Sequence, residues 1–114
     1  MKVVVLVTDY EVSDKPVRLR VIVGDAQIGA SVVKLGRKLL GSGAIDDLNL
    51  GNGSTLRGKP LFVKSVVTDH NDNTNRTSLT YQFRCGSETR EFTSMASVDE
   101  DGDSVIYRAK FNLV

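Results

Sequence analysis

The chain has 114 residues, of which 40% are hydrophobic and 25% charged, and its formal net charge is +1. This length suits one domain, taken as residues 1–114, and the composition is typical of a folded protein and not of a disordered one. The near balance of 15 basic and 14 acidic residues argues against nucleic acid or anionic membrane as a partner attracted by overall charge.

A short apolar run opens the chain. Val3 to Val7 is too short for the core of a signal peptide or for a transmembrane segment. As the chain is written, we therefore expect a cytoplasmic protein without a membrane span. Residues 2–8 are predicted to form a strand. Because this run has no polar face, we expect the strand to be covered on both sides or to complete a sheet with a partner.

Residues 17–23 alternate apolar side chains with Arg18 and Arg20, a period-2 pattern that predicts a strand with one solvated face. The turn residues Asp14 and Pro16 precede it. Through this turn, the strand could pair with the first one.

Residues 26–43 permit two interpretations. Val32, Leu35 and Leu39 have roughly helical spacing. Against a helix stand the repeated glycines of this stretch, because an internal glycine costs about 1 kcal/mol relative to alanine. We prefer two short strands around residues 35–38. Residues 44–59 then form a long connection whose apolar residues indicate that it packs down and crosses between sheets.

The clearest pattern lies in residues 59–86, where two alternating runs flank the polar cluster 69–75. This arrangement predicts a central hairpin. Its expected core residues are Leu61, Val63, Val67, Leu79, Tyr81 and Phe83.

The last third contains a tight turn at Gly86, a weaker strand at 90–95 and a well-alternating strand at 105–113. Asp101-Gly102 between these strands is a hairpin signal. With about seven to nine strands and little or no helix, the chain is predicted to be an all-β, antiparallel β-sandwich, immunoglobulin-like or jelly-roll, with Greek-key connections.

Two acidic loops, residues 69–75 and 99–103, are candidate metal sites. Calcium takes six to eight oxygen ligands, which Asp and Asn side chains supply from loops. The candidate ligands are Asp69, Asp72, Asp99, Asp101 and Asp103. The loops would form one cation site only if they share an end of the sandwich. The alternative is structural, because Asp, Asn and Gly are also the residues that turns require. No other cofactor is expected.

The sequence offers no catalytic constellation, so we expect no enzyme. The single cysteine, Cys85, and the single histidine, His70, are predicted at opposite ends of the hairpin, which disfavours a catalytic pair. Cys85 is interpreted as a half-buried filler residue and His70 as an exposed loop residue. No P-loop or nucleophile-elbow motif is present.

Basic residues recur on several predicted strands, but aromatic residues make up only 6% of the chain and do not alternate with them. We interpret these residues as solvated strand faces and expect no nucleic acid partner. They are Arg18, Arg20, Lys34, Arg37, Lys38, Arg108 and Lys110.

The functional expectation is a non-enzymatic protein–protein interaction or assembly module, with a protein partner or self-association through the apolar first strand. The alternative is a calcium-dependent ligand- or membrane-binding β-sandwich that uses the loops 69–75 and 99–103. Carbohydrate remains an open ligand class.

Overall fold

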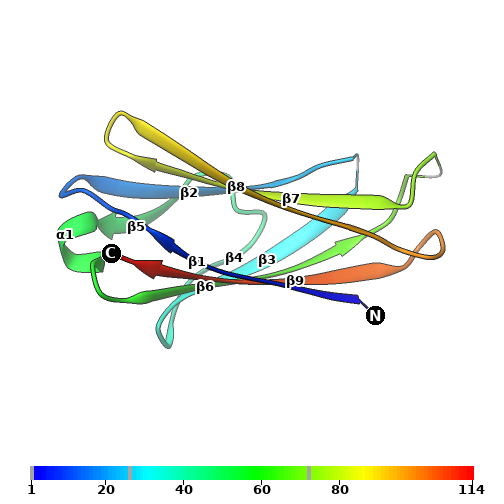
Figure 1. The fold of residues 1–114 in the computed structure, drawn as a ribbon, viewed down its shortest axis with the longest axis horizontal. Helices are drawn as coiled ribbons and strands as arrows, with labels where there is room; N and C mark the ends of the chain where they lie inside the picture. The colour runs from blue at the N-terminus through cyan, green and yellow to red at the C-terminus, as the bar shows by residue number, and fades with distance from the viewer. Residues whose placement is uncertain (1, 26, 72) are drawn as a thin grey trace.

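The computed structural model describes residues 2–25, 27–71 and 73–114. In this part of the chain, nine strands form two packed sheets (Figure 1). Sheet A has the order β1 (Lys2–Tyr10), β9 (Ser104–Leu113), β6 (Pro60–Thr68), β3 (Ile28–Leu35) and β4 (Lys38–Gly43). Sheet B has the order β5 (Leu48–Asn52), β2 (Pro16–Val23), β7 (Arg76–Cys85) and β8 (Glu88–Ser97). The predicted all-β sandwich is confirmed.

The core lies between the two sheets and is filled by the alternating apolar side chains of both. The ring centroids of Phe83 in sheet B and Phe111 in sheet A are 4.9 Å apart. Each of the six predicted core residues of segment 59–86 is at most 1% exposed. The period-2 pattern therefore identified the buried faces correctly.

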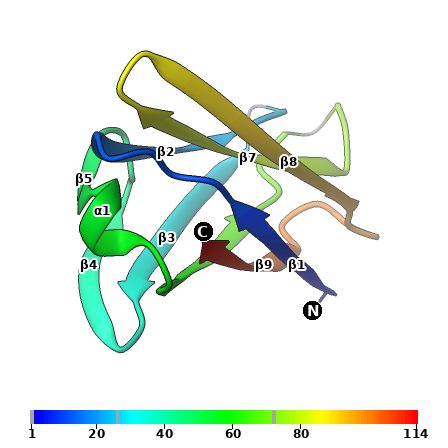
Figure 2. The same cartoon turned by 60° about the vertical axis from the view of Figure 1, so that its left-hand side comes forward.

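The ambiguous segment forms strands. β3 and β4 pair as an antiparallel hairpin, and Gly36 in its turn has a φ of +58°, which a residue with a Cβ rarely adopts. The following connection contains β5 and the short helix α1 (Gly53–Leu56), which lies beside β5 in Figure 2. Because β5 belongs to sheet B while β4 and β6 belong to sheet A, this connection crosses between the sheets, as predicted.

Two predicted hairpins are wrong. β6 lies in sheet A and β7 in sheet B, so the runs of segment 59–86 face each other across the core instead of pairing. The strands on either side of Asp101-Gly102, β8 and β9, also belong to different sheets. An alternating run shows that a strand has one buried face, but strands of both sheets of a sandwich have such a face. Alternation therefore does not show whether two consecutive strands pair or lie in opposite sheets.

The predicted pairing of the first two strands is also wrong. β1 runs parallel to β9, with Val5 opposite Arg108, and forms an edge of sheet A. It is the one parallel pair among the described strands. After β1 the chain crosses to sheet B. A hydrogen bond from the Val12 N–H to the Val114 carbonyl, at 2.9 Å, holds this crossing segment in place. No helix of the described residues is long and apolar enough to cross a membrane.

Candidate functional site

The two acidic loops meet at the end of the sandwich where the chain begins (Figure 1). The Asp69 N–H donates to the Asp103 carbonyl at 2.9 Å, and the Gly102 N–H donates to the Asp69 carbonyl at 3.0 Å. These bonds join the β6–β7 loop to the β8–β9 loop. The spatial condition for a shared cation site is therefore met.

The amide of Asn75 occupies the space between two of the carboxylates. With its nitrogen facing them, Asn75 donates to Asp101 Oδ1 at 2.8 Å and to Asp69 Oδ2 at 3.0 Å. Asp69 is only 2% exposed. A buried carboxylate needs hydrogen-bond donors, and the Asn75 amide supplies one. The amide therefore provides part of the stabilisation that a bound cation would otherwise provide.

Gln27 holds the same loop from the other side, a role that the sequence did not indicate. The buried Gln27 Oε1 accepts hydrogen bonds from the backbone N–H groups of His70 and Asn71, at 2.6 and 3.1 Å. Its Nε2 donates to the Arg76 carbonyl at 3.0 Å. A glutamine two residues after Asp25 has no sequence signature that distinguishes this role from that of a surface residue.

The predicted metal residues have different environments. Asp69 is buried, whereas Asp99, Asp101 and Asp103 are exposed. Asp103 Oδ2 accepts from the Glu100 N–H at 3.3 Å, and Asp72 lies outside the described residues. In the described part of the chain, no three His, Cys, Asp or Glu side chains form a group that could hold a metal ion. The His70 side chain is exposed, and Cys85 is buried beside Ser13 at the other end of β7.

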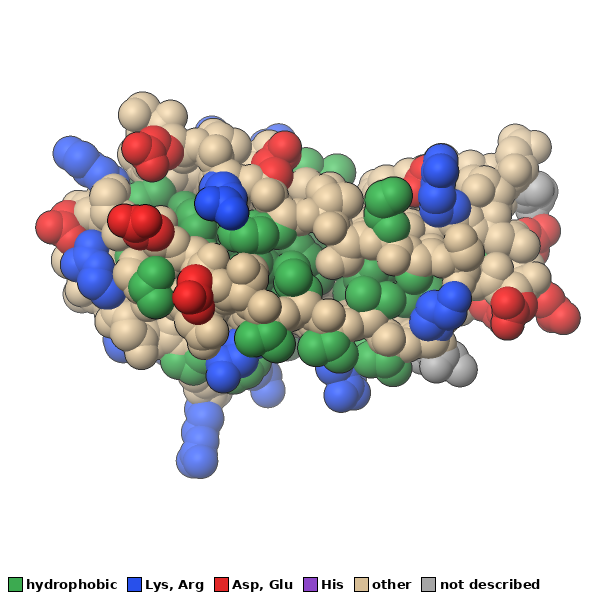
Figure 3. All heavy atoms as spheres, in the orientation of Figure 1, with side chains coloured by type: hydrophobic (Ala, Val, Ile, Leu, Met, Phe, Trp, Pro, Cys, Tyr) green, Lys and Arg blue, Asp and Glu red, His purple; other side chains and the backbone are tan. Residues whose placement is uncertain are grey.

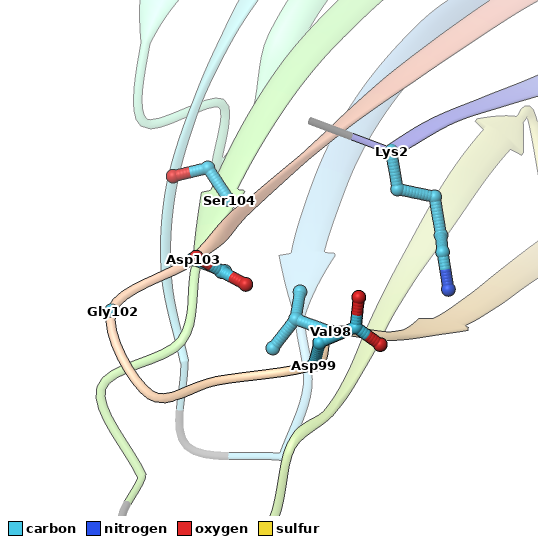
Figure 4. A pocket seen from close by; sticks show the side chains of 6 residues that line it. All are labelled: Lys2, Val98, Asp99, Gly102, Asp103 and Ser104. Atoms are coloured by element: carbon cyan, nitrogen blue, oxygen red, sulfur yellow. The ribbon is translucent and has the colours of Figure 1, made fainter.

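A cleft of about 360 Å³ opens beside these loops (Figure 4). The side chains of Lys2 and Asp103 lie on opposite sides of it, with Val98 and Asp99 between them. Lys2 Nζ donates to the Ser97 carbonyl at 2.5 Å. The cleft is lined by one cation and two carboxylates, with Val98 as its one large apolar residue, so it offers little apolar area to hold a small molecule.

The outer faces of the two sheets differ in how their charges are balanced. On sheet B, Arg18 and Arg84 both bind Asp47, with N–O distances of 2.6 and 3.2 Å. The hydrogen bond from Arg18 is the main reason why the pKa of Asp47 lies below its usual range. Arg20 pairs with Asp46 at 3.1 Å. These pairs make the outer face of sheet B a solvated surface with internal charge compensation.

The outer face of sheet A is apolar by comparison. Val3, Val5 and Val7 on β1 are 48%, 66% and 61% exposed. Eight of the eleven exposed large hydrophobic residues lie on this face: Val3, Val5, Val7, Ile28, Val32, Leu39, Phe62 and Val66. Figure 3 shows exposed hydrophobic side chains along the side of the molecule that β1 crosses. Exposed apolar side chains gathered on one face of a sheet are typical of interaction surfaces.

Among the residues that the structure describes, the cations on this face lack carboxylate partners. Lys64 is opposite Arg108 on the neighbouring strand, and Lys110 is opposite Phe62. Within the described residues, no ion pair forms at Lys34, Lys64, Arg108 or Lys110. The five described strands of sheet A contain one acidic residue, Asp9, which accepts a hydrogen bond from Asn112 at 3.1 Å. Of the predicted basic residues, Arg18 and Arg20 on sheet B thus pair with carboxylates. Lys34, Arg108 and Lys110 on sheet A form no ion pair with any described residue.

The same face is hollowed between β3, β4 and β6. A depression of about 300 Å³ is lined by Ala30, Ser31, Val32, Gly43, Lys64 and Val66. Gly43 has no side chain, so the depression stays open at β4.

The chain matches no protein-family model, and comparisons with curated proteins and with solved structures find no match either.

Proposed function

We propose that the domain is a non-enzymatic protein–protein interaction or assembly module that binds its partner through the outer face of sheet A. The observation that carries this proposal is the contrast between the two outer faces. On sheet B, the outward-facing Arg18, Arg20 and Arg84 pair with Asp46 and Asp47. Sheet A exposes apolar side chains together with cations that form no ion pair with any described residue.

Burial of the exposed valines and of Phe62 would provide the hydrophobic part of binding, at roughly 25 cal/mol per Å² of apolar surface. The cations would select a partner whose surface carries carboxylates, because complementary charge directs specificity and association rate. Edge strand β1 adds a row of backbone groups with a strand on one side only. Together these features fit a protein partner.

Capture of partners from an extract of the source cells tests this proposal, with two matched variants of the domain as bait. Phe62→Asp alters sheet A, and Met95→Asp alters the outer face of sheet B; both residues are exposed, at 40% and 59%. We expect a partner that binds wild type and Met95→Asp but not Phe62→Asp. Sedimentation of a clean monomer at high concentration, with identical capture by all three baits, would overturn the proposal.

A second candidate is a calcium-dependent ligand- or membrane-binding sandwich, favoured by the contact between the loops 69–75 and 99–103. Asp69 and Asp101, the two carboxylates around Asn75, would supply oxygen ligands, and Asn75 would exchange its amide nitrogen for its oxygen. Calcium that binds only the folded state must raise the melting temperature. An unchanged melting temperature between millimolar calcium and chelator would remove this candidate.

A further inference from the structure

We propose that the β1 strands of two copies of this chain pair antiparallel, centred on Val5, so that sheet A continues into the second copy. This inference rests on the proposed function of an assembly module and takes β1, an edge of the same sheet, as the site of self-association. Five strands from each copy would form one ten-stranded sheet.

Of the four edge strands, β1 is the least protected against pairing. The β3–β4 ladder shifts register between Val33 and Lys34, and the β2–β5 ladder shifts between Val17 and Arg18. The first half of β8 carries Glu88, Arg90 and Glu91. In β1, residues 3–8 are uncharged, contain no proline and follow β9 without a register shift. Bulges and charges are the usual devices against edge pairing, and this segment has neither.

The sequence of β1 also fits its own copy. When a twofold axis perpendicular to the sheet relates two antiparallel strands, directly opposite residues lie on the same face. Centring this axis on Val5 places Val5 opposite Val5 of the second copy and Val3 opposite Val7 of the second copy. All three exposed valines then meet valines, and Val4 lies opposite Leu6 on the inner face. Cross-strand pairs of β-branched residues are among the favourable ones in antiparallel sheets.

Charge favours edge pairing over stacking of two A faces. Stacked sheets lie roughly 10 Å apart, which would bring Lys64 and Arg108 of one copy against the same cations of the other. In edge pairing, two intervening β1 strands separate the β9 strands, so the two Arg108 residues are roughly 14 Å apart along the sheet. This distance exceeds the Debye length of about 8 Å at physiological salt.

The backbone of β1 favours protein over lipid as the occupant of this edge. One side of β1 pairs with β9, and no described strand pairs with the other side. A bilayer interior supplies no donors or acceptors for those N–H and C=O groups. A second β1 strand supplies both.

Sedimentation equilibrium measures the association directly. The protein concentration should reach about 1 mM, because one strand from each copy buries less surface area than a standard interface and the dimer is therefore weak. We expect wild type to dimerise. Val5→Lys places two ammonium groups opposite each other at the axis and should weaken the dimer at least about tenfold. Met95→Lys, on the outer face of sheet B, should leave the dissociation constant unchanged. Circular dichroism of each variant confirms that it is folded.

Disulfide formation tests the register. Directly opposite residues of antiparallel strands have Cα atoms about 4.5 to 5.5 Å apart, within the range that a disulfide spans. Val5→Cys should form a covalent dimer on mild oxidation. An equimolar mixture of Val3→Cys and Val7→Cys should form mixed dimers in preference to either homodimer. Cys85 is buried and so does not compete. Met95→Cys, at an exposed site on sheet B, should form no disulfide-linked dimer.

The outcomes separate this inference from the proposed function. A wild-type monomer at the highest concentration, with no Val5→Cys dimer, overturns self-pairing. If the same preparation captures another protein and Phe62→Asp prevents that capture, the interaction module stands with a different partner. A dimer that persists in Val5→Lys, or one that forms disulfides equally well at Met95→Cys, also overturns pairing through β1.

Discussion

Tyr107 and Thr77 join the two sheets by a hydrogen bond in the interior. The Tyr107 hydroxyl on β9 and Thr77 Oγ1 on β7 are 2.5 Å apart, and both residues are fully buried. Thr77 Oγ1 donates to the Ala96 carbonyl at 2.8 Å, so the Tyr107 hydroxyl donates to Thr77. This chain of donors links sheet A to both β7 and β8, near the end where the acidic loops meet.

Removing either hydroxyl should destabilise the domain by different amounts. Tyr107→Phe removes a donor while Thr77 keeps its bond to Ala96, so we expect a loss of about 1 kcal/mol in the free energy of unfolding. Thr77→Val deprives both the Tyr107 hydroxyl and the Ala96 carbonyl of a partner in the interior and should cost about 1 to 3 kcal/mol. Urea denaturation measures both. Equal stability of wild type and Thr77→Val would contradict this account.

Alkaline pH should unfold the domain through its tyrosines. Burial raises the pKa of Tyr10 to about 12 and also raises the pKa values of Tyr81 and Tyr107. In the unfolded chain a tyrosine titrates near 10. Between these values the folded state holds more protons than the unfolded state, so stability is full below pH 10 and falls as pH rises. Each tyrosine contributes at most about 1.4 kcal/mol per pH unit in this window.

Tyrosinate absorbance and circular dichroism, followed together with rising pH, test this expectation. Tyrosinate should appear above pH 10 in step with the loss of β-structure. Its absorbance can be followed directly because the chain has three tyrosines and no tryptophan. Tyr10→Phe should move the unfolding midpoint to higher pH. Tyrosinate that appears near pH 10 while the β-sheet signal stays intact would show that the rings are accessible in the folded state.

A matched pair of substitutions tests the assignment of inner and outer faces. Leu79 is fully buried, whereas Leu39 is 56% exposed. Leu79→Asp places a carboxylate in the core and should unfold the domain. Leu39→Asp should change the free energy of unfolding by no more than about 0.5 kcal/mol. Thermal unfolding compares them, and a folded Leu79→Asp protein would contradict the core packing.

The faces of the strands could be predicted from the sequence, whereas the partners of the strands could not. Leu79 and Val63 show their burial through period-2 alternation, which depends only on local geometry. Whether β7 pairs with β6 or with β2 depends on non-local contacts, and Asp101-Gly102 tolerates a crossover between sheets as well as a hairpin. The apolar run of β1 indicated an unusual strand, but its parallel pairing with β9 had no sequence signal.

The loop site shows the same division. The acidic composition of residues 69–75 and 99–103 was visible, and their proximity depended on the crossover of two strands to the other sheet. The amides of Gln27 and Asn75, which bind these loops internally, could not be distinguished in the sequence from surface residues. Lys64 and Arg108 form no ion pair with any described residue. The sequence did not indicate this either, because it depends on the sheet register that places the two cations side by side.

The Asn75 amide provides a direct test of whether the loops bind calcium. Asn75→Asp replaces a donor to Asp69 and Asp101 by a third carboxylate. Because like charges at close range repel, we expect this variant to have a lower melting temperature than wild type in the absence of metal. Asn73→Asp, at an exposed position, should have a smaller effect. If the loops form a cation site, millimolar calcium restores the melting temperature of Asn75→Asp, since a ligand of the folded state stabilises it. A deficit that calcium leaves unchanged would assign these loops to structure alone.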